Sequence, residues 1–477
     1  AASSATRGAV WLELEDGTQH TYADLDAESA RYANLLVSLG LKRGDRVAVQ
    51  VEKSAHTVFL YLGCLRAGMV YLPLNTAYQE GEIAHFVSDA SPRAVFCPQR
   101  ARAWFQDVPH RLEIGAAAGQ PASFATAASA ADDLACLIYT SGTTGGPKGA
   151  MLTHRNLISN ARALHAAWRF QPGDVLLHAL PMFHVHGLFV ALHTALLNAS
   201  RMIFLPRFDA GEVMRHLARA SVFMGVPTYY VRLLAEAGLS QSACEHVRLF
   251  VSGSAPLALD TFEEFRARTG HTILERYGMT ETGMNSSNPY DGERRGGTVG
   301  MPLPGVEVRV VDDADRALAA GETGHIQVRG PNVMPGYWKL PEKNKEEFTT
   351  DGFFRTGDLG KYDARGYLSI VGRAKDLVIS GGYNVYPKEI EMLLDDLPGV
   401  HESAVFGVPH ADFGEAVVAA VVLAPGAQLT EKAVIEHVKA KLANFKVPKR
   451  VVFVTDLPRN SMGKVLKTDL RAKYGAA

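Results

Sequence analysis

A segment rich in glycine and hydroxyl groups, with one lysine, is the part of the sequence best suited to chemistry. It follows the apolar run Leu134–Ile138 and reads YTSGTTGGPKG over residues 139–149. Glycines let backbone N–H groups approach an anion closely, the hydroxyls add donors, and Lys148 adds a positive charge. The segment therefore predicts a cradle for a polyphosphate. It departs from the Walker pattern, because Gly149 follows the lysine where a magnesium-binding Ser or Thr would stand.

Four more motifs follow this loop along the chain. They are YGMTE at 277–281, TGD at 356–358, GRAKD at 372–376 and PRNSMGK at 458–464. In this order, and over essentially the whole chain, the five resemble the signatures of adenylate-forming enzymes, the superfamily of acyl-CoA synthetases, luciferases and peptide-synthetase adenylation domains. The resemblance implies that a carboxylate attacks ATP to give an acyl-adenylate and pyrophosphate, and that a thiol then displaces AMP. ATP, Mg²⁺ and the co-substrate CoA are the cofactors it implies.

The resemblance also implies roles for single residues. Both reactants of the first step are anions, so the site must neutralise charge. Lys464 would bridge the carboxylate and the α-phosphate, Glu281 and Thr143 would hold the metal, and Asp358 with Arg373 would hold the ribose. Tyr277 would stack on adenine. The implied catalytic residues are Lys464, Glu281, Thr140 and His184. The implied ATP-binding residues are Thr140, Ser141, Gly142, Thr143, Thr144, Gly145, Lys148, Ser254, Ala255, Pro256, Glu275, Arg276, Tyr277, Gly278, Met279, Thr280, Asp358, Arg373 and Lys464.

Lys375 occupies the hinge position of the family, about which the small domain rotates. Lys375 lies in the GRAKD motif, and rotation there would withdraw Lys464 after adenylation. The same movement would present Gly381 and Gly382 beside the channel for the CoA thiol. A lysine on the surface of a β-turn is the alternative interpretation of Lys375.

Fewer residues in the sequence indicate where the acid binds. His184 and His186, in PMFHVHG at 181–187, match the segment that closes one side of the acid pocket in the family, although a packed core position is an alternative for either. Arg232 could pair bidentately with a second carboxylate, or lie on the outer face of a helix. Met284 and the small residues Ser252 and Gly253 would floor a short polar pocket. With segment 275–300, these features resemble most the malonyl-CoA synthetases of the family, so we expect malonate, or methylmalonate, as the acid.

The surrounding elements must position these motifs. Between residues 20 and 290, β-like runs such as Val222–Val226 alternate with helical stretches such as Asn156–Trp168, which predicts parallel sheets covered on both faces. Short strands with Gly/Pro turns follow from 300 to 370. The predicted fold class is α/β: a large N-terminal domain of parallel-type α/β sheets with a β-rich subdomain, and a small mobile α+β C-terminal domain. The expected boundaries are 1–372 for the large domain, 373–376 for the hinge and 377–477 for the small one.

Composition limits the class of protein. Lys plus Arg number 49 and Asp plus Glu 50 in 477 residues, a balance that argues against nucleic acid as a partner. No run approaches the ~20 apolar residues of a membrane span, and the N-terminus lacks a secretory pattern. The four cysteines form no CxxC pair, which indicates buried free thiols and a cytoplasmic location. We expect small-molecule partners (ATP, a dicarboxylic acid and CoA), no membrane, and a monomer or homodimer.

Other functions stay open at this point. Within the superfamily they are a short-chain or aryl acyl-CoA ligase and an adenylation enzyme that loads a carrier protein. Outside it they are a P-loop phosphotransferase and a non-catalytic nucleotide-binding protein. Acid-dependent release of AMP and pyrophosphate marks adenylation, whereas ADP marks a kinase.

Overall fold

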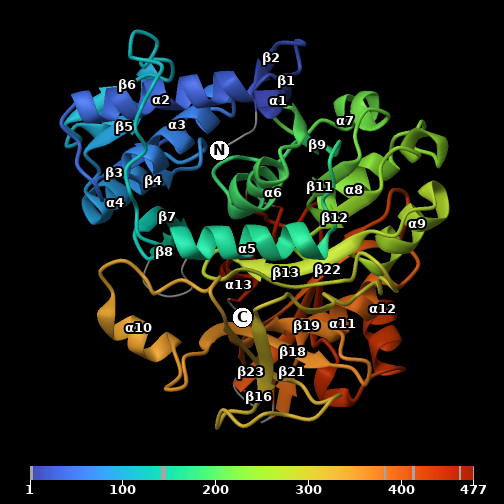
Figure 1. The fold of residues 1–477 in the computed structure, drawn as a ribbon. Helices are drawn as coiled ribbons and strands as arrows, with labels where there is room; N and C mark the ends of the chain where they lie inside the picture. Colours follow the sequence, from blue (N-terminus) through green and yellow to red (C-terminus); the bar gives the residue numbers. More distant parts are fainter. Residues whose placement is uncertain (1–3, 141–146, 381–382, 411–413, 461–462, 476–477) are drawn as a thin grey trace.

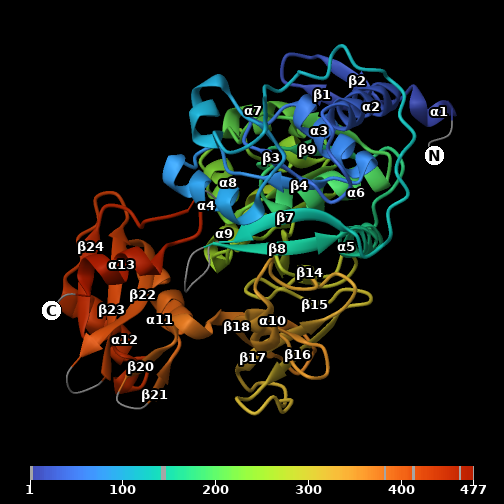
Figure 2. The same ribbon diagram turned by 90° about the vertical axis from the view of Figure 1, so that its left-hand side faces the viewer.

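The computed structural model describes residues 4–140, 147–380, 383–410, 414–460 and 463–475. Figures 1 and 2 show a large body, made by the N-terminal three quarters of the chain, and a smaller body made by the C-terminal part. Four sheets organise the two bodies. The α/β class with a large N-terminal and a small C-terminal domain is confirmed.

Two mainly parallel sheets form the upper part of the large body. The first has nine strands in the order β15 (Met301–Pro302), β14 (Gly283–Ser287), β13 (Leu274–Met279), β12 (Leu249–Ser252), β11 (Val222–Gly225), β9 (Val175–His178), β10 (Arg201–Phe204), β1 (Val10–Leu14) and β2 (Gln19–Thr21). The second has six strands in the order β6 (His110–Leu112), β5 (Ala94–Phe96), β3 (Arg46–Val49), β4 (Val70–Pro73), β7 (Leu134–Thr140) and β8 (Lys148–Thr153). Their central strands are apolar and fully buried, as β11 and β12 illustrate, because helices cover both faces.

Helices surround these sheets. Those of the large body are α1 (Ser4–Arg7), α2 (Tyr22–Ser38), α3 (Ala55–Ala67), α4 (Glu80–Ala90), α5 (His154–Ala167), α6 (Leu192–Leu197), α7 (Ala210–Leu217), α8 (Pro227–Leu234), α9 (Leu259–Thr269) and α10 (Pro341–Glu347), with short turns η1 (Gln99–Phe105), η2 (His186–Ala191) and η3 (Ser242–Cys244). The N-termini of α2 and α5 are fixed by capping boxes on Thr21 and Thr153. One large apolar core joins the two sheets.

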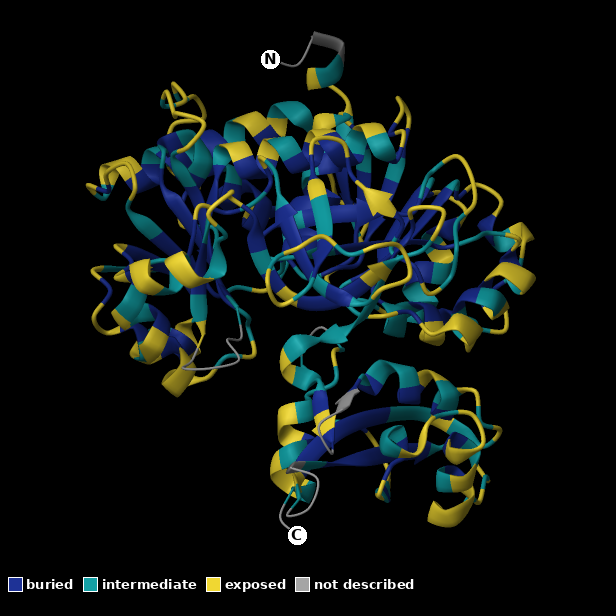
Figure 3. Ribbon diagram, turned by 90° about the horizontal axis from the view of Figure 1, so that it is seen from below, coloured by how far each residue is buried: buried dark blue, intermediate teal, exposed yellow. Residues whose placement is uncertain are grey.

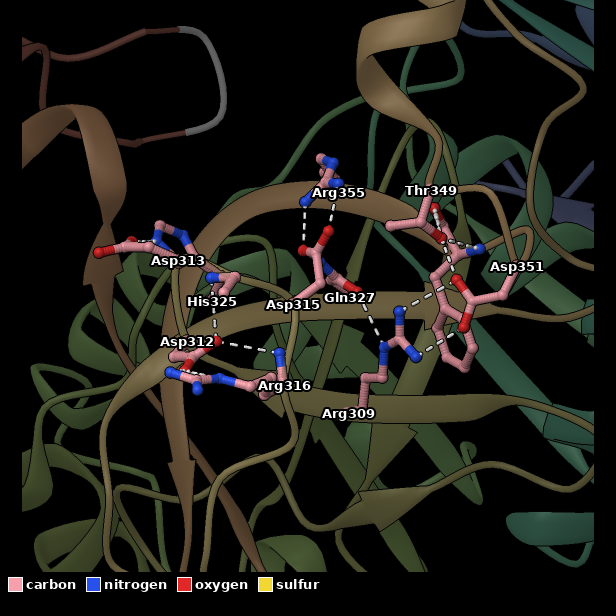
Figure 4. Close-up of polar contacts among 12 residues, drawn as sticks. Arg309, Asp312, Asp313, Asp315, Arg316, His325, Gln327, Thr349, Asp351 and Arg355 are labelled. Atoms are coloured by element: carbon pink, nitrogen blue, oxygen red, sulfur yellow. Dashed lines mark hydrogen bonds and ion pairs between the residues drawn. The ribbon is translucent and has the colours of Figure 1, made fainter.

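A four-stranded antiparallel sheet forms the β-rich part of the large body. Its order is β16 (Glu307–Val311), β17 (Gly324–Arg329), β18 (Phe354–Tyr362) and β19 (Leu368–Arg373). Figure 4 shows a polar network across its outer face, in which Asp315 faces Arg355 and Gln327 while Arg309 faces Asp351. Arg309, Gln327 and Arg355 of this network lie on β16, β17 and β18, in the same sheet as Asp358 and Arg373.

The small body follows through η4 (Ala374–Asp376). Its sheet has the order β21 (Tyr383–Val385), β20 (Val378–Ser380), β23 (Gly414–Leu423) and β22 (Val400–His410), with β24 (Arg450–Val454) paired to β23. Its helices are α11 (Pro387–Asp395), α12 (Glu431–Lys439), η5 (Asn444–Lys446) and α13 (Lys467–Tyr474). Figure 3 shows that this body has a buried interior of its own, made of separate apolar clusters.

Expectations on secondary structure and on the cysteines are also met in the described residues. The predicted strand at 222–226 and the predicted helix at 156–168 are present, with ends shifted by at most two residues, and the apolar run Leu134–Ile138 lies in β7. All four cysteines are free and buried. No helix in the described part of the chain is long and apolar enough to cross a membrane.

Candidate active site

Three of the motifs meet in one hydrogen-bonded network on the large body. Asp358 of β18 and Arg373 of β19 are opposite each other in the antiparallel register, and Arg373 Nε donates to Asp358 Oδ1 at 2.7 Å. Tyr277 of β13 donates its hydroxyl to Asp358 Oδ2 at 2.5 Å. Burial raises the pKa of Tyr277, so the phenol remains a proton donor. The fold therefore gathers the predicted ribose and adenine residues, which are far apart in the chain.

A buried carboxylate lies beside this network. Glu281 accepts a hydrogen bond from the hydroxyl of Tyr337 at 2.9 Å, and the Thr140 hydroxyl is also within hydrogen-bonding range. Burial raises the pKa of Glu281, whereas the charge of Arg373 opposes that rise. A carboxylate with a neighbouring hydroxyl suits a hard cation that also binds phosphate oxygens. Thr140 and Glu281 thus fit Mg²⁺, while Thr143 lies outside the described residues.

The lysine of the glycine-rich loop is held by neighbours. Lys148 Nζ lies 3.7 Å from the carboxylate of Glu347 on α10 and 4.6 Å from the centre of the Tyr337 ring. Tyr337 therefore contacts both Lys148 and Glu281. Sequence reasoning missed Tyr337, because an aromatic residue after a glycine is too common to signal a site. The other loop residues predicted to bind ATP lie outside the described part of the chain: Ser141, Gly142, Thr143, Thr144 and Gly145.

Lys464 reaches the same region from the small body. The charges of Asp358, Arg373 and Lys375 all act on it, and burial followed by the charge of Arg373 lowers the pKa of its amine. The turn that carries it is fixed from within, since Arg459 donates to Gly463 O at 2.7 Å and pairs with Glu402. The small body thus holds the predicted catalytic lysine against the predicted nucleotide site.

The turn also contacts the large body. A Cβ at Gly463 would lie 3.2 Å from Thr228 Cγ2, so the turn packs closely on α8. In the predicted hinge, Lys375 has a pKa lowered by burial, and Asp376 binds Arg471 of α13 at 3.0 Å. Gly381 and Gly382, predicted beside the CoA channel, lie outside the described residues.

The predicted acid-pocket residues gather around a buried arginine. Arg276 of β13 is only 4% exposed, and a Cβ on Gly253 would lie 2.3 Å from its Cζ, so glycine is needed there. Its charge acts on His184 and His186, whose pKa values are lowered first by burial and then by this arginine, that of His184 to about 4. Arg276, expected among the ATP-binding residues, thus lies beside three of the residues expected in the acid pocket.

Arg276 has no anionic partner in the described part of the chain. Its Nε and Nη2 are buried without a hydrogen bond, as are Ser252 Oγ and His186 Nε2. Burial without a counter-charge lowers the pKa of this guanidinium, and only Tyr230 opposes the shift. Unpaired buried charges are costly, so a group of this kind is typical of a site that awaits an anion.

The two histidines lie where the chain enters the π-helical turn η2. The backbone N–H of His186 donates to His184 Nδ1 at 3.2 Å, which leaves the His184 proton on Nε2. His186 Nδ1 lies 3.3 Å from the hydroxyl of Ser254, and Ser254 has a φ of +74°. π-helical turns and left-handed backbone at a non-glycine residue are both typical of functional sites.

Arg232 is exposed on α8 and lines a cavity together with Pro181, Met182 and Phe183 of the PMFHVHG segment. The wall of that cavity includes none of the residues Arg276, Ser252, Gly253 and Met284. The pairing of Arg232 with a second carboxylate therefore stays a prediction.

The remaining predicted residues occupy the strands and loops around the site. Glu275 is buried, accepts from the N–H of Gly297 at 3.2 Å, and has a pKa raised by burial to about 8. Gly278 opposes Met284 across β13 and β14. Ala255 and Pro256 follow Ser254 at the end of β12, and Met279 and Thr280 follow Gly278 in the motif.

The chain is similar to known proteins over nearly its whole length. The family model described as AMP-binding enzyme matches residues 1–338, and the one described as AMP-binding enzyme C-terminal domain matches residues 389–464. The malonate–CoA ligase of Arabidopsis thaliana is 35% identical over 96% of this chain and 85% of its own. The sulfoacetate–CoA ligase of Cupriavidus necator is 35% identical over 98% of this chain and 97% of its own.

A solved structure is similar over the whole chain. The crystal structure of ATP-bound MatB from Rhodopseudomonas palustris is 53% identical, covers 98% of this chain and 96% of its own, and has a TM-score of 0.96. The apo form of the same protein has a TM-score of 0.84 at the same identity and coverage. The structure of this chain is thus more similar to the ATP-bound structure than to the apo structure.

Proposed function

The chain belongs to the AMP-binding enzyme family and is an adenylate-forming acid–CoA ligase, and we propose that malonate is the acid it activates. Malonate and ATP would give malonyl-adenylate and pyrophosphate, and CoA would then give malonyl-CoA and AMP. The relatives at 35% identity include ligases named for malonate and for sulfoacetate. Both acids carry a second anionic group close to the reacting carboxylate.

The observation that carries the choice of acid is the buried, unpaired guanidinium of Arg276. A monocarboxylic acid would leave it unpaired after the reacting carboxylate is used, whereas the second carboxylate of malonate would neutralise it. Charge-assisted hydrogen bonds of this kind each contribute roughly 1.5–3 kcal/mol. Gly253 packs against this guanidinium and Ser252 beside it in the chain carries a buried hydroxyl without a hydrogen bond, so a pocket at this place would be short and polar.

The chain's own residues would neutralise the reacting anions. Lys464 would lie between the attacking carboxylate and the α-phosphate, and Arg373, held by Asp358, would support the nucleotide beside it. Thr140 and Glu281 would hold Mg²⁺, which supplies charge neutralisation on the phosphates. Tyr337 would orient Glu281 through its hydroxyl.

Sulfoacetate is the second candidate acid. The same guanidinium would pair with a sulfonate, because its fork of N–H donors fits any planar or tetrahedral oxyanion. A feruloyl-CoA synthase of Amycolatopsis is 34% identical, but its named acid has no second anion for Arg276.

A panel of acids with ATP, Mg²⁺ and CoA tests the proposal. Malonate, methylmalonate, sulfoacetate, propionate and ferulate are compared by release of AMP and by formation of the thioester. We expect kcat/KM for malonate to exceed that for propionate by at least about a hundredfold, in line with one buried charge pair. Equal use of propionate or ferulate would overturn the assignment, and release of ADP would overturn the reaction type.

A further inference from the structure

His178 connects a lysine to the π-helical turn η2, which begins at His186. It is the last residue of β9 and is only 1% exposed. Its Nε2 lies 3.0 Å from the backbone oxygen of Gly187, and its Nδ1 lies 2.9 Å from Nζ of Lys53. Lys53 Nζ also donates to the backbone oxygen of His178 at 2.8 Å. One imidazole ring thus joins three segments of the chain.

The partners of this imidazole fix where its proton lies. A backbone oxygen only accepts, so Nε2 of His178 carries the hydrogen and donates it to Gly187. Nδ1 is then an acceptor, which the ammonium group of Lys53 requires because that group only donates. Burial, followed by the charge of Lys53, lowers the pKa of His178, so the ring remains neutral. Lys53 therefore donates to His178, and His178 donates to Gly187.

The stability of the fold does not by itself explain Lys53. It forms no ion pair in the described part of the chain, and burial alone lowers its pKa well below the usual value. Its ammonium group lies 4.1 Å from the centre of the Phe204 ring. Taking an ammonium group out of water without a carboxylate partner is costly. Groups shifted in this way cluster at functional sites, so we looked for a function in the hydrogen bonds to His178.

The carbonyl group that His178 binds is part of the π-helical hydrogen bonding of η2. In an α-helix the oxygen of Gly187 would accept from the N–H four residues on, at Ala191. Here it accepts from the N–H of Leu192, five residues on. A carbonyl oxygen has two lone pairs, so it can also accept from His178. The hydrogen bond from His178 therefore lies where one extra residue is inserted into the turn.

The register of η2 decides where His184 and His186 point. One residue of an α-helix corresponds to a rotation of about 100°, so loss of the extra residue would turn these side chains relative to α6 by that amount. In the observed register His186 Nδ1 lies 3.3 Å from the hydroxyl of Ser254. The charge of Arg276 acts on both histidines. The geometry of the predicted acid-binding residues thus depends on this turn.

We infer that Lys53 and His178 are positioning residues for the acid. Lys53 fixes the ring of His178, and His178 holds η2 in the register that places His184 and His186 beside Arg276. The part of η2 in acid binding rests on the proposed function, whereas the hydrogen bonds from Lys53 to Gly187 do not. Both residues act through the backbone of η2.

Two replacements of His178 separate hydrogen bonding from packing. Phenylalanine keeps a ring but donates nothing, whereas glutamine loses the ring but keeps an N–H donor and an acceptor. The assay is exchange of pyrophosphate into ATP, which requires no CoA. We expect His178→Phe to raise the KM for malonate by about tenfold and His178→Gln by at most about threefold. The KM for ATP should stay within about twofold of the wild type in both.

The reverse order of the two variants would indicate a packing role and would overturn the inference. Equal rises in the KM for malonate and for ATP would overturn it too. His165→Gln is the matched control, because His165 is a half-buried histidine of α5 that lies 3.0 Å from Asn198 and does not contact η2. It should change neither KM.

A double-mutant cycle tests whether Lys53 acts through His178. Lys53→Met alone should raise the KM for malonate by about tenfold, and the double variant should be no worse than His178→Phe alone. Effects that multiply would mean that Lys53 acts on the acid independently of His178, and would overturn the inference. Lys42→Met, at an exposed lysine after α2, is the control and should leave the KM unchanged.

The ring nitrogens of His178 give a readout that needs no substrate. In the full-length chain labelled with ¹⁵N-histidine, the signals of His178 are those that disappear in His178→Gln. At neutral pH they should show a protonated Nε2 and an unprotonated Nδ1. Lys53→Met should shift the Nδ1 signal, whereas Lys42→Met should not.

This readout separates the inference from the proposed function. If malonate supports no exchange but the Nδ1 signal shifts, the acid assignment fails, and the KM comparison is made with whichever acid of the panel supports exchange. If malonate supports exchange but His178 is protonated on Nδ1, or its signal is unchanged in Lys53→Met, the inference fails and the proposed function stands.

Discussion

Arg276 is the residue on which the choice of acid depends. Replacement by methionine removes a buried cation that has no partner in the described structure. We predict that Arg276→Met lowers kcat/KM for malonate by roughly a hundredfold while the KM for ATP changes little. Because an unpaired buried charge is destabilising, the same variant should melt at an equal or higher temperature than the wild type. Pyrophosphate exchange and thermal unfolding measure the two effects, and a lowered melting temperature would indicate a structural role instead.

Gly253 makes room for that guanidinium. A Cβ there would lie 2.3 Å from Arg276 Cζ, so Gly253→Ala must displace the arginine. We predict a raised KM for malonate with ATP binding retained, measured by exchange and by nucleotide titration. Gly372→Ala is the control, since a Cβ at Gly372 meets nothing within 4 Å. Equal malonate kinetics in the Gly253 variant would contradict the pocket described here.

The sequence motifs named the residues that the structure brings together around Asp358, but they assigned Arg276 to ATP and not to the acid for which we propose it. Arg276 and Tyr277 are adjacent in β13, and adjacent side chains of a strand point to opposite faces. Tyr277 binds Asp358 on one side, and Arg276 meets Gly253 on the other. The alternation of side chains along a strand could have separated Arg276 from Tyr277 in the sequence. Their adjacency in one motif suggested instead that both bind ATP.

Among the elements, the four-stranded sheet β16–β19 carries Asp358 and Arg373, and the polar network on its outer face stabilises this sheet. Asp315 accepts hydrogen bonds from Arg355 at 2.5 Å and from Gln327 at 2.6 Å, which lowers its pKa to about 2. A lowered carboxyl pKa stabilises the fold above the unfolded-state value of about 3.9, and the effect is lost as pH falls through the folded-state value.

Asp315→Asn should therefore lower stability at neutral pH, and the difference from wild type should shrink between about pH 4 and pH 2. Asparagine tolerates the left-handed backbone of this position, where φ is +60°, so the substitution tests the charge. Denaturant unfolding at several pH values measures the difference. A difference independent of pH would contradict this account of the network.

The sequence predicted the parallel strands and long helices, because apolar runs and 3.6-residue periodicity depend on local composition. It did not predict the π-helical turn η2 or the contact between Gly463 and α8. Both depend on packing between segments far apart in the chain, which no local pattern encodes.

At the scale of the whole molecule, the position of Lys464 requires both bodies. The small body supplies the lysine, and the large body supplies the Asp358–Arg373 pair whose charges act on it. We predict that Lys464→Ala abolishes malonyl-adenylate formation, because the attacking carboxylate and the phosphate then repel each other, yet retains thioester formation from supplied malonyl-adenylate. Arg162→Gln, at an exposed position of α5, serves as the control. Equal loss in both half-reactions would contradict a rotation of the small body about residues 373–376.

Malonate-dependent exchange of labelled pyrophosphate into ATP, in the absence of CoA, measures whether Arg276 selects a dicarboxylic acid. We predict rapid exchange with malonate, at least about a hundredfold weaker exchange with propionate, and loss of that preference in Arg276→Met. Equal exchange with the two acids, or a preference for malonate that survives in Arg276→Met, would contradict it.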